Sequence, residues 1–149
     1  LESLKTAYKH APYLEEHLDF LEDLFTPKWE RLVDLNLAVI RHLLSAFQLD
    51  VKVVLQSELG IKAKGTQLLV ELCRALGAET YVILDQVKKH LDLPLFEQNG
   101  IKLRPLKYVP PVYPQLWGDF LANLSSLDLI LNCGPKARNF LLHRQPGGR

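Results

Sequence analysis

The sequence predicts an α/β protein with three layers: a mostly parallel sheet with helices on both faces, and long helices at the N-terminus. Apolar residues recur at helical spacing up to residue 47, whereas Val51–Leu55 and Thr80–Leu84 are short, β-branched runs. A helical pattern over Thr66–Leu76 separates the two runs. Because strands that alternate with helices are typical of right-handed crossovers, we expect these two runs to be adjacent parallel strands.

Three helices are expected before the first strand. Apolar spacing indicates two short helices, over Leu1–Ala11 and Leu14–Phe25. A third is expected from about Lys28 to Phe47. Thr26 is a favoured N-cap residue type, and Pro27 suits the first helical position, so we expect this pair to start the third helix.

The second half of the chain continues the alternation. Leu72 is expected to face the sheet from the Thr66–Leu76 helix, and Gly77 is expected to end that helix in a left-handed conformation. A third extended segment follows, weakened by Pro105. The other expected helices cover Pro94–Asn99, Asn123–Asn132 with Asn123 or Ser125 as its N-cap, and Pro135 to about Leu142.

Composition bounds the class of protein. A chain of 149 residues with 48% apolar and 23% charged residues fits one globular domain, expected over residues 1–142 with a flexible tail at 143–149. The net charge of +1 argues against a nucleic-acid binder. Neither a secretory signal pattern nor an apolar run of about 20 residues is present, so we expect a cytoplasmic protein without a membrane span. Cys73 and Cys133 are interpreted as reduced, buried thiols.

The loop after the first predicted strand is the first candidate site, because ligands of open α/β sheets bind beyond the carboxyl ends of the strands. It contains Ser57 and Glu58, and then Lys64, Gly65 and Thr66 at the start of a helix. A lysine and a glycine at a helix N-terminus can hold a phosphate or a carboxylate. The alternative is a plain helix start with Thr66 as cap, which composition alone favours.

No metal site and no cofactor are assigned. The run Asp85–Asp92 follows the second predicted strand and contains His90. A metal site needs ligands that converge on one point, and a single histidine beside two lysines is more typical of solvated surface.

The segment Pro110–Gly118, "PPVYPQLWG", cannot form a regular helix, because proline removes a backbone donor and clashes with the preceding turn. A stiff segment that carries Tyr113, Gln115 and Trp117 holds their side chains at fixed angles. Such preorganisation suits a pocket for a sugar or a nucleotide. The alternative is a packing plug across the sheet, with Trp117 buried in the core.

Seven segments, read in order, resemble the WbqC-like protein family, whose members occur in bacterial gene clusters for surface polysaccharides. The resemblance covers about Leu1 to Leu142. The segments are "YKHAPY", "WERLVDLNLAVIRHL", "SELGIKAKGT", "LCRALGAETY", "LFEQNGI", "PPVYPQLWG" and "NLSSLDLILNCGP". The residues of the proline-rich segment that match the family pattern are Pro111, Tyr113, Pro114, Gln115, Trp117 and Gly118.

The resemblance implies a transferase-type role in surface polysaccharide biosynthesis, acting on a nucleotide-linked sugar or another anionic small molecule. Under this hypothesis Lys64 neutralises an anion and Glu58 serves as the base. Tyr113 and Gln115 orient the substrate. The remaining residues expected to line the site are Ser57, Gly65 and Thr66.

The sequence departs from the family pattern in three places. The family's N-terminal region with its "HQP" strand end has no counterpart here. Pro110 stands where the family has histidine, and Ile83–Lys88 replaces a loop rich in serine and glycine. The alternative function is therefore a degenerate, non-catalytic ligand-binding domain. We expect this chain alone to lack transferase activity and to self-associate through an uncovered strand edge.

Overall fold

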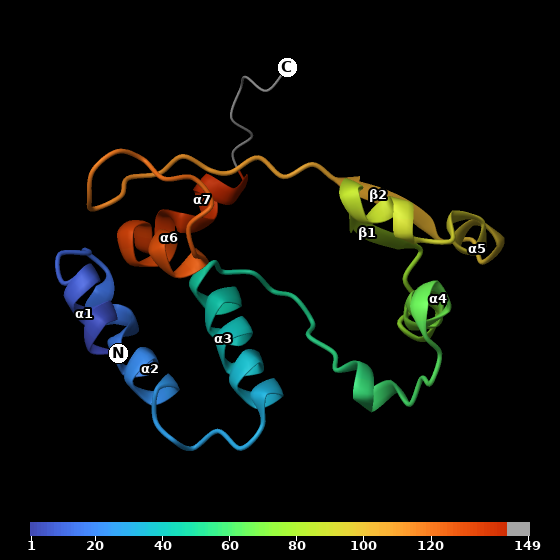
Figure 1. Ribbon diagram of the computed structural model, residues 1–149, viewed down its shortest axis with the longest axis horizontal. Coiled ribbons are helices and arrows are strands. Elements are labelled where there is room, and N and C mark those ends of the chain that lie inside the picture. Colours follow the sequence, from blue (N-terminus) through green and yellow to red (C-terminus); the bar gives the residue numbers. More distant parts are fainter. Residues whose placement is uncertain (143–149) are drawn as a thin grey trace. The chain divides into compact units, whose positions relative to one another are not determined.

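The computed structural model describes residues 1–142, and the predicted tail at 143–149 lies outside them. The chain divides into two compact units, each described here by itself. Unit 1 is formed by Leu1–Val51 and, within the described residues, by the chain from Val109 onward. Unit 2 is Lys52–Tyr108. Together they contain helices and a small parallel sheet, as an α/β protein requires (Figure 1).

Unit 1 is helical. Its elements are α1 (Glu2–Tyr8), α2 (Leu14–Leu24), α3 (Leu32–Ala46), α6 (Ser126–Cys133), the short 3-10 helix η3 (Gly134–Lys136) and α7 (Ala137–Leu142). The core is built around α6, whose Ile130 and Leu131 are fully buried. Leu21 of α2 and Phe47, just after α3, pack into the same cluster. The two predicted short helices are confirmed as α1 and α2, and Ser125 is the N-cap of α6.

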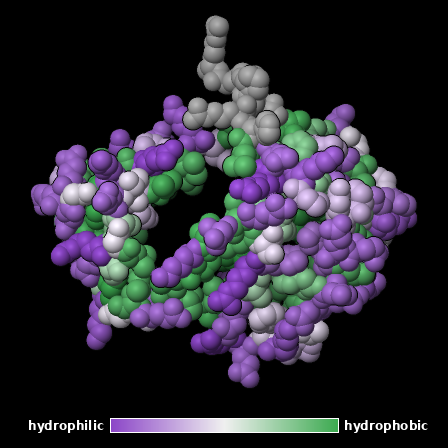
Figure 2. Space-filling view, turned by 180° about the vertical axis from the view of Figure 1, so that it is seen from behind, coloured by the Kyte–Doolittle hydropathy of each residue, from purple (hydrophilic) through white to green (hydrophobic). Residues whose placement is uncertain are grey.

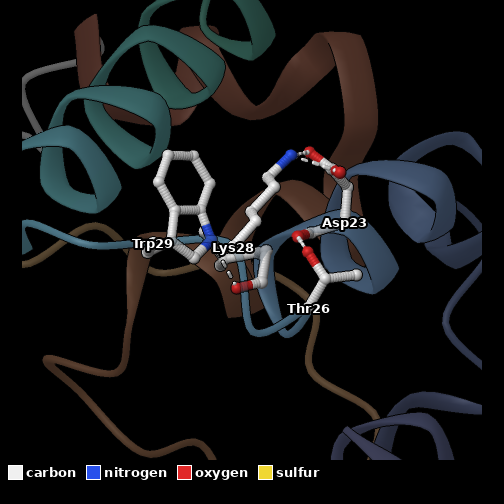
Figure 3. A network of polar contacts seen from close by, with 5 residues as sticks. Asp23, Thr26, Lys28 and Trp29 are labelled. Carbon is white, nitrogen blue, oxygen red and sulfur yellow. Dashed lines mark hydrogen bonds and ion pairs between the residues drawn. The ribbon is translucent and has the colours of Figure 1, made fainter.

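The predicted start of the third helix at Thr26 and Pro27 is wrong, because α3 begins at Leu32. The residues before α3 form hydrogen bonds to the C-terminal end of α2 instead (Figure 3). The Thr26 hydroxyl donates to the Asp23 carbonyl over 2.7 Å, and the Trp29 indole N–H donates to the Leu24 carbonyl over 3.0 Å. Lys28 also forms an ion pair with the Asp23 carboxylate. These contacts complete α2, which leaves Thr26 unavailable as a cap for the next helix.

Unit 2 contains the sheet. Its elements are the 3-10 helix η1 (Gln56–Leu59), α4 (Gly65–Ala75), β1 (Thr80–Leu84), the 3-10 helix η2 (Asp85–His90), α5 (Leu93–Gln98) and β2 (Lys102–Leu106). The strands β1 and β2 pair in parallel, with Thr80 opposite Lys102 and Ile83 opposite Pro105 (Figure 1). In the described residues this is the whole sheet, so Pro105 lies in an edge strand, where the missing backbone donor is tolerated.

The prediction that Val51–Leu55 forms a strand beside Thr80–Leu84 is wrong. This run has no strand assignment, and β1 pairs with β2 instead. The chain passes from unit 1 to unit 2 between Val51 and Lys52, within the run itself. A β-branched pattern favours an extended backbone, but a strand also needs a neighbour that accepts its hydrogen bonds.

Glycines end two helices of unit 2, and the stop at Gly77 is as expected. At Gly77, where φ is +64°, the backbone N–H donates to Arg74 and the N–H of Ala78 donates to Cys73. The same pair of bonds occurs at Gly100, where φ is +69°. This is the Schellman arrangement, which requires a left-handed residue and therefore favours glycine.

Two details of α4 differ from the prediction. Thr66 is not its cap, because the N-cap residue is Lys64 and the Thr66 hydroxyl accepts from the backbone N–H of Asp92. Leu72 is only half-buried, whereas Val70 and Cys73 are buried with Phe96. The buried face of α4, with Val70 and Cys73, therefore packs against α5 and differs from the expected face. The first strand that α4 was expected to cover does not form.

Hydrophobic side chains reach the surface in both units (Figure 2). In unit 2 they include Val82 and Leu84 of β1 and Leu106 of β2. Among the helices of the described residues, none is long and apolar enough to cross a membrane.

Candidate functional site

The most distinctive polar group of unit 1 is the buried carboxylate of Asp128, which is 5% exposed. The Tyr8 hydroxyl donates to Oδ1 over 2.9 Å, and the Tyr113 hydroxyl donates to Oδ2 over 2.8 Å. The Asn132 amide also donates to Oδ1, over 3.2 Å. Asp128 is the third residue of α6, where the helix dipole stabilises negative charge. Neutral donors and this dipole together offset part of the cost of burying the carboxylate.

Both tyrosines remain protonated around neutral pH. Burial, together with the hydrogen bond to Asp128, raises the pKa of Tyr8 to about 12. Burial also raises the pKa of Tyr113 to about 12, with Asp128 adding to the effect and Gln115 opposing it. Each hydroxyl therefore acts as a donor to Asp128 and does not serve as a base at neutral pH.

A pocket with a volume of about 170 Å³ lies beside this cluster in unit 1. It is lined by Ala7, Tyr8, Gln115, Leu116, Trp117, Leu121, Leu124 and Asp128. The lining combines apolar and aromatic surface with a hydroxyl, an amide and a carboxylate. Few, fixed polar groups in a mostly apolar hollow are typical of small-molecule sites.

Side-chain contacts fix the segment that forms one wall of the pocket. The Gln115 amide donates to the Leu121 carbonyl and accepts from the Leu121 N–H, both over 2.9 Å. This pair closes the loop between the two residues. The Trp117 indole N–H donates to the Ala7 carbonyl over 3.0 Å, and the ring meets His10 edge-on at 5.9 Å. Trp117 is thus anchored at one edge while 60% of the residue is exposed, so it is not a core plug.

The sequence-predicted site residues are divided between the units. Tyr113 is buried against Asp128, and Gln115 lines the pocket, both in unit 1. Ser57 and Glu58 are exposed on η1 in unit 2, and Lys64 is the exposed N-cap residue of α4. Gly65, with φ of +59°, and the half-buried Thr66 follow it at the helix start. Their assignment to a common site stays a prediction.

Other candidate chemistry in the described residues is sparse. Cys73 and Cys133 are free and buried, as expected, and burial raises the pKa of both thiols. No group of three or more histidine, cysteine or acidic side chains within residues 1–142 converges as a metal site. The His17 and His42 rings meet at 3.0 Å between Nδ1 and Nε2, linking α2 to α3.

Sequence reasoning missed Asp128 as a site residue. Its position in the first turn of a helix had a sufficient explanation in the helix dipole. The signal that could have revealed it is an acid between apolar residues, in the helical segment that follows the proline-rich run. Its partner Tyr8 is 120 residues away, and a single sequence does not show such a pairing.

The described residues form an α/β protein with a small parallel sheet, and unit 1 contains a pocket beside the proline-rich segment. The model of the WbqC-like protein family matches residues 1–140, so the chain belongs to that family. This confirms the resemblance drawn from the seven segments.

A curated relative is "Uncharacterized protein Rv1507c" of Mycobacterium tuberculosis (strain ATCC 25618 / H37Rv). It is 25% identical over 141 residues, which cover 93% of this chain and 61% of that protein. The chain thus spans less than two thirds of the length of this relative. No solved structure matches the chain.

Proposed function

We propose that this protein has a transferase-type role in surface polysaccharide biosynthesis, and that the pocket of unit 1 binds the sugar ring of a nucleotide-linked sugar. Family membership supports the biological setting. The cytoplasm is the compartment we propose, and two free, buried cysteines agree with a reducing environment.

The observation that carries the proposal is that Trp117 and Asp128 line the same pocket. A pyranose ring has faces of C–H groups and a rim of hydroxyls. The exposed indole of Trp117 offers a flat surface for a C–H face, and its bond to Ala7 fixes its angle. The carboxylate of Asp128 and the hydroxyl oxygen of Tyr8 can accept hydrogen bonds from sugar hydroxyls. Preorganisation of these groups lowers the ordering cost of binding.

The remaining residues of the proposal lie in unit 2. Lys64 precedes the free backbone N–H groups at the start of α4 and forms no ion pair within the described residues. It would neutralise a phosphate of the nucleotide, with Gly65 and Thr66 beside it. Glu58 would act as the base, and Ser57 lies next to it on η1.

The three-layer architecture belongs to the same proposal. A sheet of two strands leaves apolar side chains of β1 and β2 exposed, among them Val82 and Leu106. Coverage of these side chains by further elements, with helices on both faces of a larger sheet, would bury this surface and stabilise the sheet.

Calorimetric titration of the chain with nucleotide-linked sugars and with the free nucleotides tests the proposal. We expect the sugar to add affinity, and Trp117→Ala to weaken sugar binding by up to about tenfold, as one aromatic contact allows. Trp29→Ala is the matched control, since Trp29 bonds to the end of α2 and does not line the pocket.

Mass spectrometry of the same mixtures with an acceptor sugar then separates the two forms of the proposal. Turnover that Glu58→Ala abolishes identifies a transferase. Sugar binding without turnover identifies the non-catalytic ligand-binding alternative. Equal affinity for the nucleotide with and without its sugar contradicts the proposed sugar site.

A further inference from the structure

The carboxylate of Asp128 has no cationic partner among residues 1–142. The ion pairs there join Lys5 to Glu2 and Glu22, Lys28 to Asp23, and Arg31 to Asp34. The side-chain partners of Asp128 are two tyrosine hydroxyls and one amide, all neutral. A buried charge is usually paired, because neutral donors replace only part of its hydration. Asp128 therefore keeps a negative potential beside the pocket.

The pocket lining does nothing to cancel this potential. None of the described residues that line the pocket is a lysine, an arginine or a histidine. Tyr8, with a pKa of about 12, remains neutral, and Gln115 is neutral at every pH. A ligand in the pocket thus meets one negative charge and no positive charge from its walls.

The carboxylate also has capacity for another donor. Two carboxylate oxygens offer about four acceptor sites, and the chain's own side chains fill three of them. The unfilled site can accept an N–H or an O–H. An ammonium group forms the stronger, charge-assisted bond, whereas a carboxylate or phosphate is repelled.

We propose that Asp128 makes the pocket selective for an amino sugar over the neutral sugar, and for both over a uronic acid. This inference rests on the proposed function, and it adds the class of sugar. The protonated amine of the bound sugar would supply the cationic partner that the buried carboxylate lacks among the described residues.

Three methyl glycosides test this selectivity near neutral pH and at low salt: the glucosaminide, the glucoside and the glucuronide. Each is titrated into the full chain while the indole N–H signals of Trp117 and Trp29 are followed by NMR. We expect the Trp117 signal to move and the Trp29 signal to stay. The glucosaminide should bind about tenfold more tightly than the glucoside, and the glucuronide more weakly than either.

Asp128→Asn removes the charge and keeps the size, so it should reduce the amine preference to about twofold or less. Asp119→Asn, at an exposed acid in the loop that carries Trp117, is the control and should leave the order unchanged. If Asp128→Asn does not fold, the order measured on the unchanged chain decides the question. Equal affinities, or a preference for the glucuronide, overturn the inference and leave the sugar site intact. No shift of Trp117 with any of the three overturns both.

Discussion

The two units differ in what holds them together. Unit 1 depends on contacts between distant parts of the chain: Tyr8 with Asp128, Trp117 with Ala7, and a core built around α6. Besides the β1–β2 pairing and the bond between Thr66 and Asp92, unit 2 depends on local signals, namely the Schellman glycines Gly77 and Gly100 and the Asp92 cap of α5. Its buried cluster is small, with Val70, Cys73, Phe96 and Ile101. The pocket lies in the unit where the long-range contacts are.

This difference explains why the pocket forms in unit 1. Long-range hydrogen bonds fix side chains from separate elements at set angles, which a preorganised pocket needs. Local caps fix helix ends only, and in unit 2 the side chains of Ser57, Glu58 and Lys64 are exposed.

Gly134→Ala should be the most damaging single change, costing about 3 kcal/mol or more. A Cβ at this position would lie 2.4 Å from the Tyr13 ring, and φ is +50°. Gly60→Ala in unit 2 is the matched control, since φ is +64° with nothing within 4 Å. It should cost only the left-handed strain, about 1–2 kcal/mol. Equal losses of unfolding free energy for the two variants, measured with denaturant, would contradict the close packing of Gly134 against Tyr13, the N-cap residue of α2.

Tyr113→Phe should cost about 2 kcal/mol, because it removes a buried hydrogen bond to a charged group. Tyr8→Phe should cost less, about 1 kcal/mol, since Tyr8 is only half-buried. Tyr108→Phe, at an exposed tyrosine of unit 2, should change stability by under about 0.5 kcal/mol. A similar cost for all three, measured by denaturant unfolding, would show that Asp128 does not organise unit 1.

Acidification should destabilise the chain through His17 and His42. Burial lowers the pKa of both rings below the usual value of 6.5, and His17 lowers that of His42 further. The unfolded chain then binds more protons, so stability present above about pH 6.5 is lost as the pH falls toward the folded values. The slope is at most about 1.4 kcal/mol per pH unit for each ring.

The pH effect is checked by thermal unfolding between about pH 7.5 and 5. His42→Phe should flatten the curve, because it removes one titrating ring and preserves an aromatic stack on Phe20. His90→Ala, at an exposed histidine of unit 2, is the control and should preserve the slope. A curve that His42→Phe leaves unchanged would remove the histidine pair as the cause.

Helix caps should matter least and equally in both units. Asp92→Ala in unit 2 and Ser125→Ala in unit 1 each remove a side-chain acceptor for a helix N–H. Each should cost about 1 kcal/mol, measured by denaturant unfolding. A much larger cost for Ser125→Ala would mean that the local cap, rather than the long-range contacts, sustains α6.

The contrast between local signals and long-range contacts also determines which features the sequence can predict. Gly77, Gly100 and Ser125 were predictable, because a left-handed stop or a cap depends on neighbouring residues. Val51–Leu55 was not, since a strand depends on a partner elsewhere in the chain. The family motifs led to Tyr113 and Gln115, and both contribute to the pocket region. Asp128 escaped, because only the folded chain brings it to Tyr8.

Hydrogen–deuterium exchange with and without a saturating nucleotide-linked amino sugar tests the central claim most directly. Backbone amides of unit 1 near the pocket, from Tyr113 to Leu121 and at the start of α6, should exchange more slowly when the sugar is bound. The start of α4 at Gly65 should be protected by the nucleotide with or without its sugar. Protection of α4 alone, with no slowing between Tyr113 and Leu121, would contradict the placement of the sugar site in unit 1.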